Sequence, residues 1–311
     1  MSDAPASARV PPAPDAIDAP ERSLWSDVWR QFRRHPGAMI GVTLFLVIVA
    51  AVALGPTLWP IDPSYIDVRA RNAAPSLVHP MGTDNIGRDI FAQVLQGGRV
   101  SLAVGMTAML LSVFLGTLIG VLAGYFRRLD GLLMRLTDLF LALPILPLLL
   151  VILMLFRDTL RAAFGPETGI FLLIVFIIGV TSWMQTARIV RGDVLALKER
   201  EFVLAAQSIG TPSRRIILRH ILPNVMSPIM VSATLGVASA IITESALSFL
   251  GLGFPSDFPT WGRLLFDGAN FMTISPARVI WPGLAISLTV LSVNYIGDGL
   301  RDALDPRIRG R

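Results

Sequence analysis

The hydrophobic positions of this chain gather into long uncharged blocks that shorter charged segments separate. A helix needs about 20 mostly apolar residues to cross the hydrocarbon core of a bilayer. Pro144 and Pro147 are expected to kink the third of the blocks that reach this length. The pattern predicts an all-α polytopic membrane protein with about six transmembrane helices, at 38–58, Val100–Phe126, Leu139–Phe156, Thr168–Ala187, Ile221–Leu250 and Val279–Gly297.

Composition agrees with a membrane protein. The 311 residues are 53% hydrophobic and 16% charged, whereas a soluble domain carries about 25% charged residues. The sequence pI of about 10.5 raises the question of nucleic acid, but the arginines border the apolar blocks without interleaved aromatic residues. That placement is typical of membrane topology, so membrane lipid is an expected partner and nucleic acid is not. The absence of cysteine excludes disulfides and thiolate metal sites.

Basic residues predict the orientation in the membrane. An even number of crossings places both termini on one side, and that side carries 19 of the 27 Lys and Arg residues. Because basic residues favour the cytoplasmic side, both termini are predicted to be cytoplasmic. Residues 1–20 are rich in Ala, Pro and Asp and are expected to be disordered. The predicted organisation is an N-terminal tail at 1–37, a first span at 38–58, an extracytoplasmic segment at 59–98, a core at 99–300 with five spans and a cytoplasmic loop at 188–224, and a C-terminal tail at 301–311.

The cytoplasmic loop has the pattern of a helix, a sharp turn and a second helix. Arg200–Ile209 has helical character, and Gly210 suits its C-cap. Thr211 is expected to be the N-cap, and Pro212 the first residue, of the second helix. That helix is predicted to cover Ser213–Leu222 and to stop at the following proline.

Two interpretations of this loop stay open from the residues alone. The small side chains of Ala205 and Ala206 allow another surface to approach closely, which favours a docking role. The basic residues of the second helix, Arg214, Arg215 and Arg219, equally suit a surface loop that contacts lipid head groups.

The same loop carries a resemblance to a known motif. Ala205-Ala206, Gly210 and Leu222-Pro223 match the spacing of the EAA loop of ATP-binding-cassette (ABC) importer permeases. Leu204 stands where the consensus has Glu, and His220 where it has Ile. Leu204 has no charge, so this position offers no ionic contact, while docking by shape is compatible with the sequence.

Three further stretches, His79–Arg88, Ile242–Gly253 and Gly297–Arg307, resemble one family in the same order along the chain. With the Phe32–Ile40 segment, the likeness covers nearly the whole chain after residue 20. The sequence is similar to the C-type permease subunit of the dipeptide/oligopeptide/nickel ABC importer family.

This resemblance implies a type I ABC importer permease (MetI-like) fold in a bacterial inner membrane. It implies that the chain forms half of a pore for di- or oligopeptides, with a second homologous permease, two ABC ATPase subunits and an extracytoplasmic substrate-binding protein as partners. ATP and Mg would be bound by the ATPases, so no cofactor is expected in this chain. The residues that would dock onto the ATPase are Arg200, Glu201, Ala205, Ala206, Ser208, Gly210 and Thr211.

The sequence offers no basis for chemistry of its own. The sole lysine, Lys198, lies between Leu197 and Glu199, so the chain has no P-loop and is not expected to be an enzyme. Its three histidines, at positions 35, 79 and 220, are distant in sequence and lie on different sides of the predicted membrane. No metal site and no catalytic triad is expected.

Two features inside the predicted spans allow more than one interpretation. Glu244 is either a functional group (a gate contact, a substrate-path group or a proton relay) or a structural residue bonded to neighbouring helices and to the loop after Gly251. The stripe of Gly116, Gly120 and Gly124 permits close helix packing, either against the partner permease or within this chain.

Alternatives to a peptide permease also remain. A nickel or other small-solute ABC permease has the same expected architecture. A proton-coupled carrier would need paired charges at mid-membrane or broken helices in matching halves, and only Glu244 offers such a charge. A non-transporting membrane subunit leaves the shaped loop at 199–223 unexplained.

Overall fold

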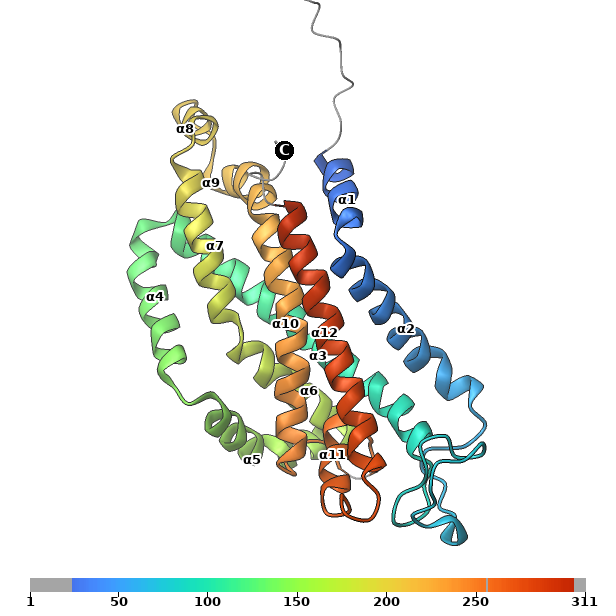
Figure 1. The fold of residues 1–311 in the computed structure, drawn as a ribbon. Coiled ribbons are helices and arrows are strands. Elements are labelled where there is room, and N and C mark those ends of the chain that lie inside the picture. The colour runs from blue at the N-terminus through green and yellow to red at the C-terminus, as the bar shows by residue number, and fades with distance from the viewer. Residues whose placement is uncertain (1–23, 256, 305–311) are drawn as a thin grey trace, which may run out of the picture.

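The computed structural model describes residues 24–255 and 257–304, which form helices joined by loops (Figure 1). No β-strand occurs in this described part; a single β-bridge joins Thr83 and Asp89. The helices are α1 (Leu24–Arg34), α2 (Pro36–Leu58), α3 (Ile90–Tyr125), α4 (Arg127–Ala142), α5 (Ile145–Phe164), α6 (Pro166–Thr181), α7 (Trp183–Lys198), α8 (Glu201–Ser208), α9 (Ser213–Ile216), α10 (Met226–Phe249), α11 (Trp261–Ala269) and α12 (Ala277–Leu304).

Five helical stretches among the described residues are long and apolar enough to cross a membrane, or six if the bent pair of α4 and α5 counts as one span. They are α2, α3, the α6–α7 stretch Pro166–Lys198, the α9–α10 stretch Ser213–Phe249, and α12. This confirms the predicted all-α membrane fold with about six spans. The long α3 is its centre and contacts α2, α6, α7, α10 and α12.

The third predicted span differs most from the structure. Leu139–Phe156 was expected to be one kinked helix, but α4 ends at Ala142 and α5 begins at Ile145, with 88° between them. Pro144 is the N-cap of α5. The break follows from its chemistry, since proline has no N–H to donate and disfavours the helical conformation at Leu143.

Other helix boundaries also differ from those predicted from the sequence. α3 begins ten residues before Val100, because Asp89 caps it by accepting a hydrogen bond from the Ala92 N–H at 2.6 Å. α11 was not predicted at all. The α6–α7 stretch continues eleven residues past the predicted end at Ala187 and is broken at Ser182.

Both ends of the described chain lie at one end of the molecule, together with α8 (Figure 1). α1 packs on α12, where His35 Nε2 lies 3.4 Å from Asp302 Oδ2. The 59–89 segment, α5 and α11 lie at the opposite end (Figure 1). This arrangement agrees with an even number of crossings. The predicted disorder at residues 1–20, and residues 305–311 of the C-terminal tail, fall outside the described residues.

Candidate functional site

The turn after α8 has the geometry of a Schellman motif. Gly210 has φ +77°, its N–H donates to the Gln207 carbonyl at 3.0 Å, and the Thr211 N–H donates to the Ala206 carbonyl at 3.1 Å. These bonds satisfy the last carbonyls of α8, and the left-handed conformation at their centre favours glycine. The predicted role of Gly210 as a helix-ending glycine is confirmed.

The start of the next helix was predicted one residue too early. Pro212, not Thr211, is the N-cap of α9, and its carbonyl accepts from the N–H of Arg215 at 2.9 Å. Thr211 precedes a proline, which disfavours the helical conformation there. Nor does the helix stop at Pro223: a π-turn at Ile217–Ile221 and a 3₁₀-turn at Leu222–Val225 carry it into α10. This change of hydrogen-bond register accommodates the missing N–H of the proline.

α8 has one face on the protein and one face open. Val203 and Ala206 are buried in an apolar cluster with Val194 of α7 and with Ile221 and Val225 at the base of α10. The opposite face is exposed and carries, at helical spacing, Glu201, Leu204, Ala205 and Ser208. Phe202 and Ile209 flank this face, with 45% and 82% of their surfaces exposed. We call Glu201, Leu204, Ala205 and Ser208 the outer face of α8.

The two alanines that were predicted to dock onto the ATPase therefore face in different directions. Ala205 lies on the outer face, while Ala206 is only 7% exposed and packs inside the chain. The expectation that Ala206 contacts another protein is corrected by this burial. A helix of period 3.6 residues turns consecutive positions by about 100°, so adjacent small residues cannot share one narrow contact face.

Glu244 is fully buried on α10 among hydroxyl groups. Ser248 Oγ donates to its Oε1 at 2.8 Å, and Ser101 Oγ on α3 donates to its Oε2 at 3.2 Å. Ser101 Oγ also accepts from the N–H of Trp261, the first residue of α11, at 3.2 Å. The carboxylate therefore links α10 to α3 through the Ser101 hydroxyl. The same hydroxyl links both helices to the first residue of α11. The sequence identified Glu244 but missed Ser101, which lies 143 residues earlier in the chain.

The glycine stripe of α3 faces α7 of the same chain. A Cβ on Gly116 would lie 2.7 Å from the Trp183 carbonyl oxygen, and a Cβ on Gly120 would lie 2.6 Å from that of Ala187. A Cβ on Gly124 would lie 2.7 Å from Val194 Cβ. The structure thus uses the stripe for packing within this chain, one of the two interpretations that the sequence allowed.

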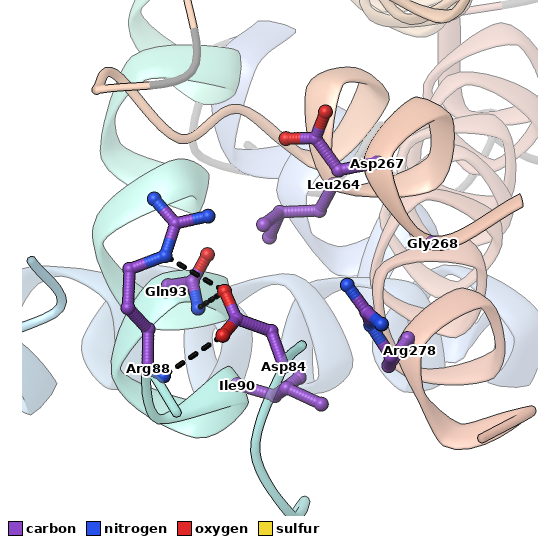
Figure 2. A pocket seen from close by; sticks show the side chains of 8 residues that line it. All are labelled: Asp84, Arg88, Ile90, Gln93, Leu264, Asp267, Gly268 and Arg278. Atoms are coloured by element: carbon purple, nitrogen blue, oxygen red, sulfur yellow. Dashed lines mark hydrogen bonds and ion pairs between the residues drawn. The ribbon is translucent and has the colours of Figure 1, made fainter. Parts of the chain in front are cut away.

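A polar cluster joins the 59–89 segment to α3, α11 and α12 (Figure 2). Asp84 accepts from the backbone N–H and the Nε of Arg88, at 2.8 and 2.7 Å. From the other side, Arg278 of α12 donates from Nη2 to Asn85 Oδ1 at 2.7 Å, and its guanidinium carbon lies 4.0 Å from the centre of the Phe271 ring. The His79–Arg88 stretch marked this region in the sequence, but its partners in α11 and α12 were not predicted.

Comparison with known proteins agrees with the motifs. Residues 116–310 match the family described as binding-protein-dependent transport system inner membrane component. Residues 23–75 match the N-terminal transmembrane domain of oligopeptide transport permease C. Among solved structures, the chain is similar to one of the inward-facing MetNI methionine ABC transporter, with a TM-score of 0.49 and 16% identity over 66% of this chain and 95% of that chain.

Two curated relatives match over nearly their whole length. The oligopeptide transport system permease protein OppC of Bacillus subtilis is 38% identical over 315 residues, which cover 99% of this chain and 100% of that protein. A putative peptide transport system permease protein of Brucella abortus is 41% identical over 282 residues, 90% of this chain and 91% of that protein. The family predicted from the motifs is confirmed: this chain belongs to the inner-membrane components of binding-protein-dependent transport systems, a family of transport permeases.

Proposed function

We propose that this chain is a permease subunit of an ABC importer for peptides and forms half of the translocation pore. A second homologous permease would complete the pore, an extracytoplasmic binding protein would deliver the peptide, and two ATPase subunits would bind ATP and Mg and hydrolyse the nucleotide. The peptide substrate is supported by the two relatives, whose names specify peptide and oligopeptide transport. The chain itself would hold no cofactor and act on no substrate covalently.

The outer face of α8 is the observation that carries this proposal. Leu204 of α8 is 43% exposed and Ile209, the C-cap residue that follows the helix, is 82% exposed, although the C-terminal end of this short helix is closed by backbone hydrogen bonds. The inner side of that helix is anchored by Val203 and Ala206 to the base of α10. A protein bound to the outer face would therefore push on α10 directly, which is what coupling of ATP hydrolysis to movement of a span requires.

The proposed orientation places α8 and both termini in the cytoplasm and residues 59–98 outside. Its support is the excess of basic residues in the sequence segments predicted to be cytoplasmic, which carry 19 of the 27. Because the chain has no cysteine, single cysteines can report the orientation. With the permease expressed without its ATPase, so that the outer face of α8 is uncovered, Ala205→Cys should react with a membrane-impermeant thiol reagent only in inverted vesicles. Leu77→Cys, at a fully exposed position, should react only in intact cells. The opposite result would overturn this orientation.

Docking is tested with Ala205→Trp, which places a large ring on the outer face. We expect the variant to insert and to pair with the second permease but to recover less ATPase when the complex is purified in mild detergent. Ser208→Ala is the matched control on the same face, because it removes only a hydroxyl that bonds back to the Leu204 carbonyl at 3.0 Å. Normal ATPase recovery and normal uptake by Ala205→Trp would contradict the docking role.

The substrate is tested by uptake into proteoliposomes that hold the complete complex. A radiolabelled dipeptide mixture and radiolabelled nickel are offered separately, with ATP inside and the binding protein outside. We expect ATP-dependent accumulation of the peptides alone. Accumulation of nickel instead would overturn the peptide assignment while leaving the ABC permease role in place.

A further inference from the structure

A cavity of about 340 Å³ lies where two irregular places in the spans meet the middle of α10. One wall comes from the bend between α4 and α5, at Leu143. A second comes from the break between α6 and α7, at Ser182 and Gln185. The third is the middle of α10, at Ser239 and Thr243. This cavity is separate from the Glu244 cluster, none of whose residues line it.

The polar groups of this cavity lie deep within the spans. Ser182 follows the 16 residues of α6 and precedes the 16 residues of α7, so at a rise of about 1.5 Å per residue it is about 24 Å from either end of that stretch. Ser239 is ten residues, or about 15 Å, from the end of α10 at Phe249. Both positions therefore fall at the depth of the hydrocarbon core.

Three of these polar side chains are exposed and have no hydrogen-bond partner in the part of the chain that the structure describes. Ser182, Gln185 and Ser239 are solvent-accessible in the isolated chain, and the side chains of these three make no hydrogen bond within residues 24–255 and 257–304. Two nearby hydroxyls do have partners. The Thr181 hydroxyl donates to the Ile177 carbonyl at 2.6 Å, and the Thr243 hydroxyl donates to the Ser239 carbonyl at 2.8 Å. An amide facing lipid without a partner is costly.

The backbone gives a second reason to expect water here. Helix breaks at membrane depth are tolerated where they are buried in protein or line a water-filled cavity. Leu143 and Ser182, the two residues at the breaks, both line this one cavity. Two broken helices and three unsatisfied polar side chains thus face a common space.

We propose that this cavity is a section of the path along which the transported peptide crosses the membrane, and that Ser182, Gln185 and Ser239 hydrogen-bond to its amide groups. The proposal rests on the peptide-importer function. The Gln185 carboxamide can donate and accept at once, as a peptide bond requires. No charged side chain is among the residues that line the cavity. Neutral groups of this kind can hydrogen-bond to the main-chain amides of any peptide. The cavity is therefore expected not to discriminate between peptides by the charge of their side chains.

The experiment uses single cysteines in the assembled complex, reconstituted in proteoliposomes. Ser182→Cys, Gln185→Cys and Ser239→Cys are compared with Phe176→Cys and Ile242→Cys, whose parent side chains are 59% and 51% exposed on the same two stretches. A charged methanethiosulfonate reagent should label the three cavity thiols at least about tenfold faster, because the thiolate that reacts forms in water and not in lipid. The unmodified cysteine-free chain in the same complex gives the background.

Two further measurements test whether the cavity is the path that the transported peptide takes, separately from whether peptides are the substrate. A saturating dipeptide mixture with ATP should slow labelling of the cavity thiols, and Gln185→Leu should lower peptide uptake about fivefold while Gln185→Asn retains more of it. Unreactive thiols in a complex that imports peptide would overturn the path and leave the proposed function standing. Reactive thiols in a complex that imports no peptide would support the path and overturn the peptide substrate. Crosslinking of each of the three cysteines to the second permease by a thiol-attached photoreactive group, with no labelling by the charged reagent, would make this face a subunit interface and overturn the proposal.

Discussion

Two turns at opposite ends of the molecule each have a glycine with a positive φ but have different surroundings. Gly87, beside the Asp84 cluster, has φ +93°, and Gly210, after α8, has φ +77°. A Cβ on Gly87 would lie 1.8 Å from the Asp67 carbonyl oxygen, whereas a Cβ on Gly210 would meet nothing within 4 Å. The first turn is enclosed by its own chain, and the second is open to whatever binds there.

The same difference extends to the regions around the turns. Near Gly87, the side chains of Asp84, Asp89 and Arg278 each make a hydrogen bond within the chain: Asp84 accepts from Arg88, Asp89 caps the start of α3, and Arg278 donates from Nη2 to Asn85. Near Gly210, the buried side chains of α8 are Val203 and Ala206, which pack on α7 and the base of α10, and the other residues of the helix are exposed. One end is stabilised by internal contacts, and the other leaves a well-formed helix face for another protein. The following substitutions test this contrast.

Gly87→Ala should have the largest effect. The methyl group would overlap backbone atoms of Asp67 and would force an unfavourable φ, which together should cost more than about 3 kcal/mol. We expect low recovery of folded protein and a large drop in the midpoint of thermal unfolding in detergent, followed by tryptophan fluorescence. Gly131→Ala is the control, because its Cβ meets nothing within 4 Å on helix α4 and should be neutral or slightly stabilising.

Ala206→Trp should destabilise the fold, whereas Ala205→Trp should not. The indole at position 206 would have to enter the cluster that contains Val203 and Ile221, and such overpacking costs about 2 kcal/mol. The measurement is the unfolding midpoint of each permease without ATPase. Equal midpoints for the two variants would show that α8 is not anchored as described.

Glu244→Leu should cost about 1–2 kcal/mol, because the hydroxyls of Ser101 and Ser248 lose the carboxylate that they donate to. Glu244→Gln keeps an acceptor and should cost less. We also expect peptide uptake by Glu244→Gln to depend on ATP and not on a proton gradient, measured with and without a protonophore. Loss of a pH-dependent component of uptake in that variant alone would favour a proton-coupled carrier.

Gly210→Ala should have the smallest effect, about 1 kcal/mol, since only the left-handed φ opposes it. It should leave the unfolding midpoint nearly unchanged and lower ATPase recovery modestly. Gly210→Val should lower recovery further, because a β-branched side chain tolerates this conformation less well. A drop in stability as large as that of Gly87→Ala would remove the contrast between the two ends.

Local patterns were sufficient for much of this structure. The apolar blocks predicted the all-helical fold and about six spans, because burial of a long apolar helix in lipid depends little on its neighbours. Gly210 was recognised as a helix end, because the Schellman bonds join residues at most five positions apart. The order of the motifs identified the family.

The tertiary structure alone decided what each side chain meets. The sequence could not assign Ala205 outward and Ala206 inward, because that choice depends on where α8 lies against α10. It could not find the bond between Glu244 and Ser101, which are 143 positions apart. Nor could it gather Leu143, Ser182 and Ser239 around one cavity. Hydropathy and capping act over a few residues, whereas these contacts arise only when helices distant in the chain pack together.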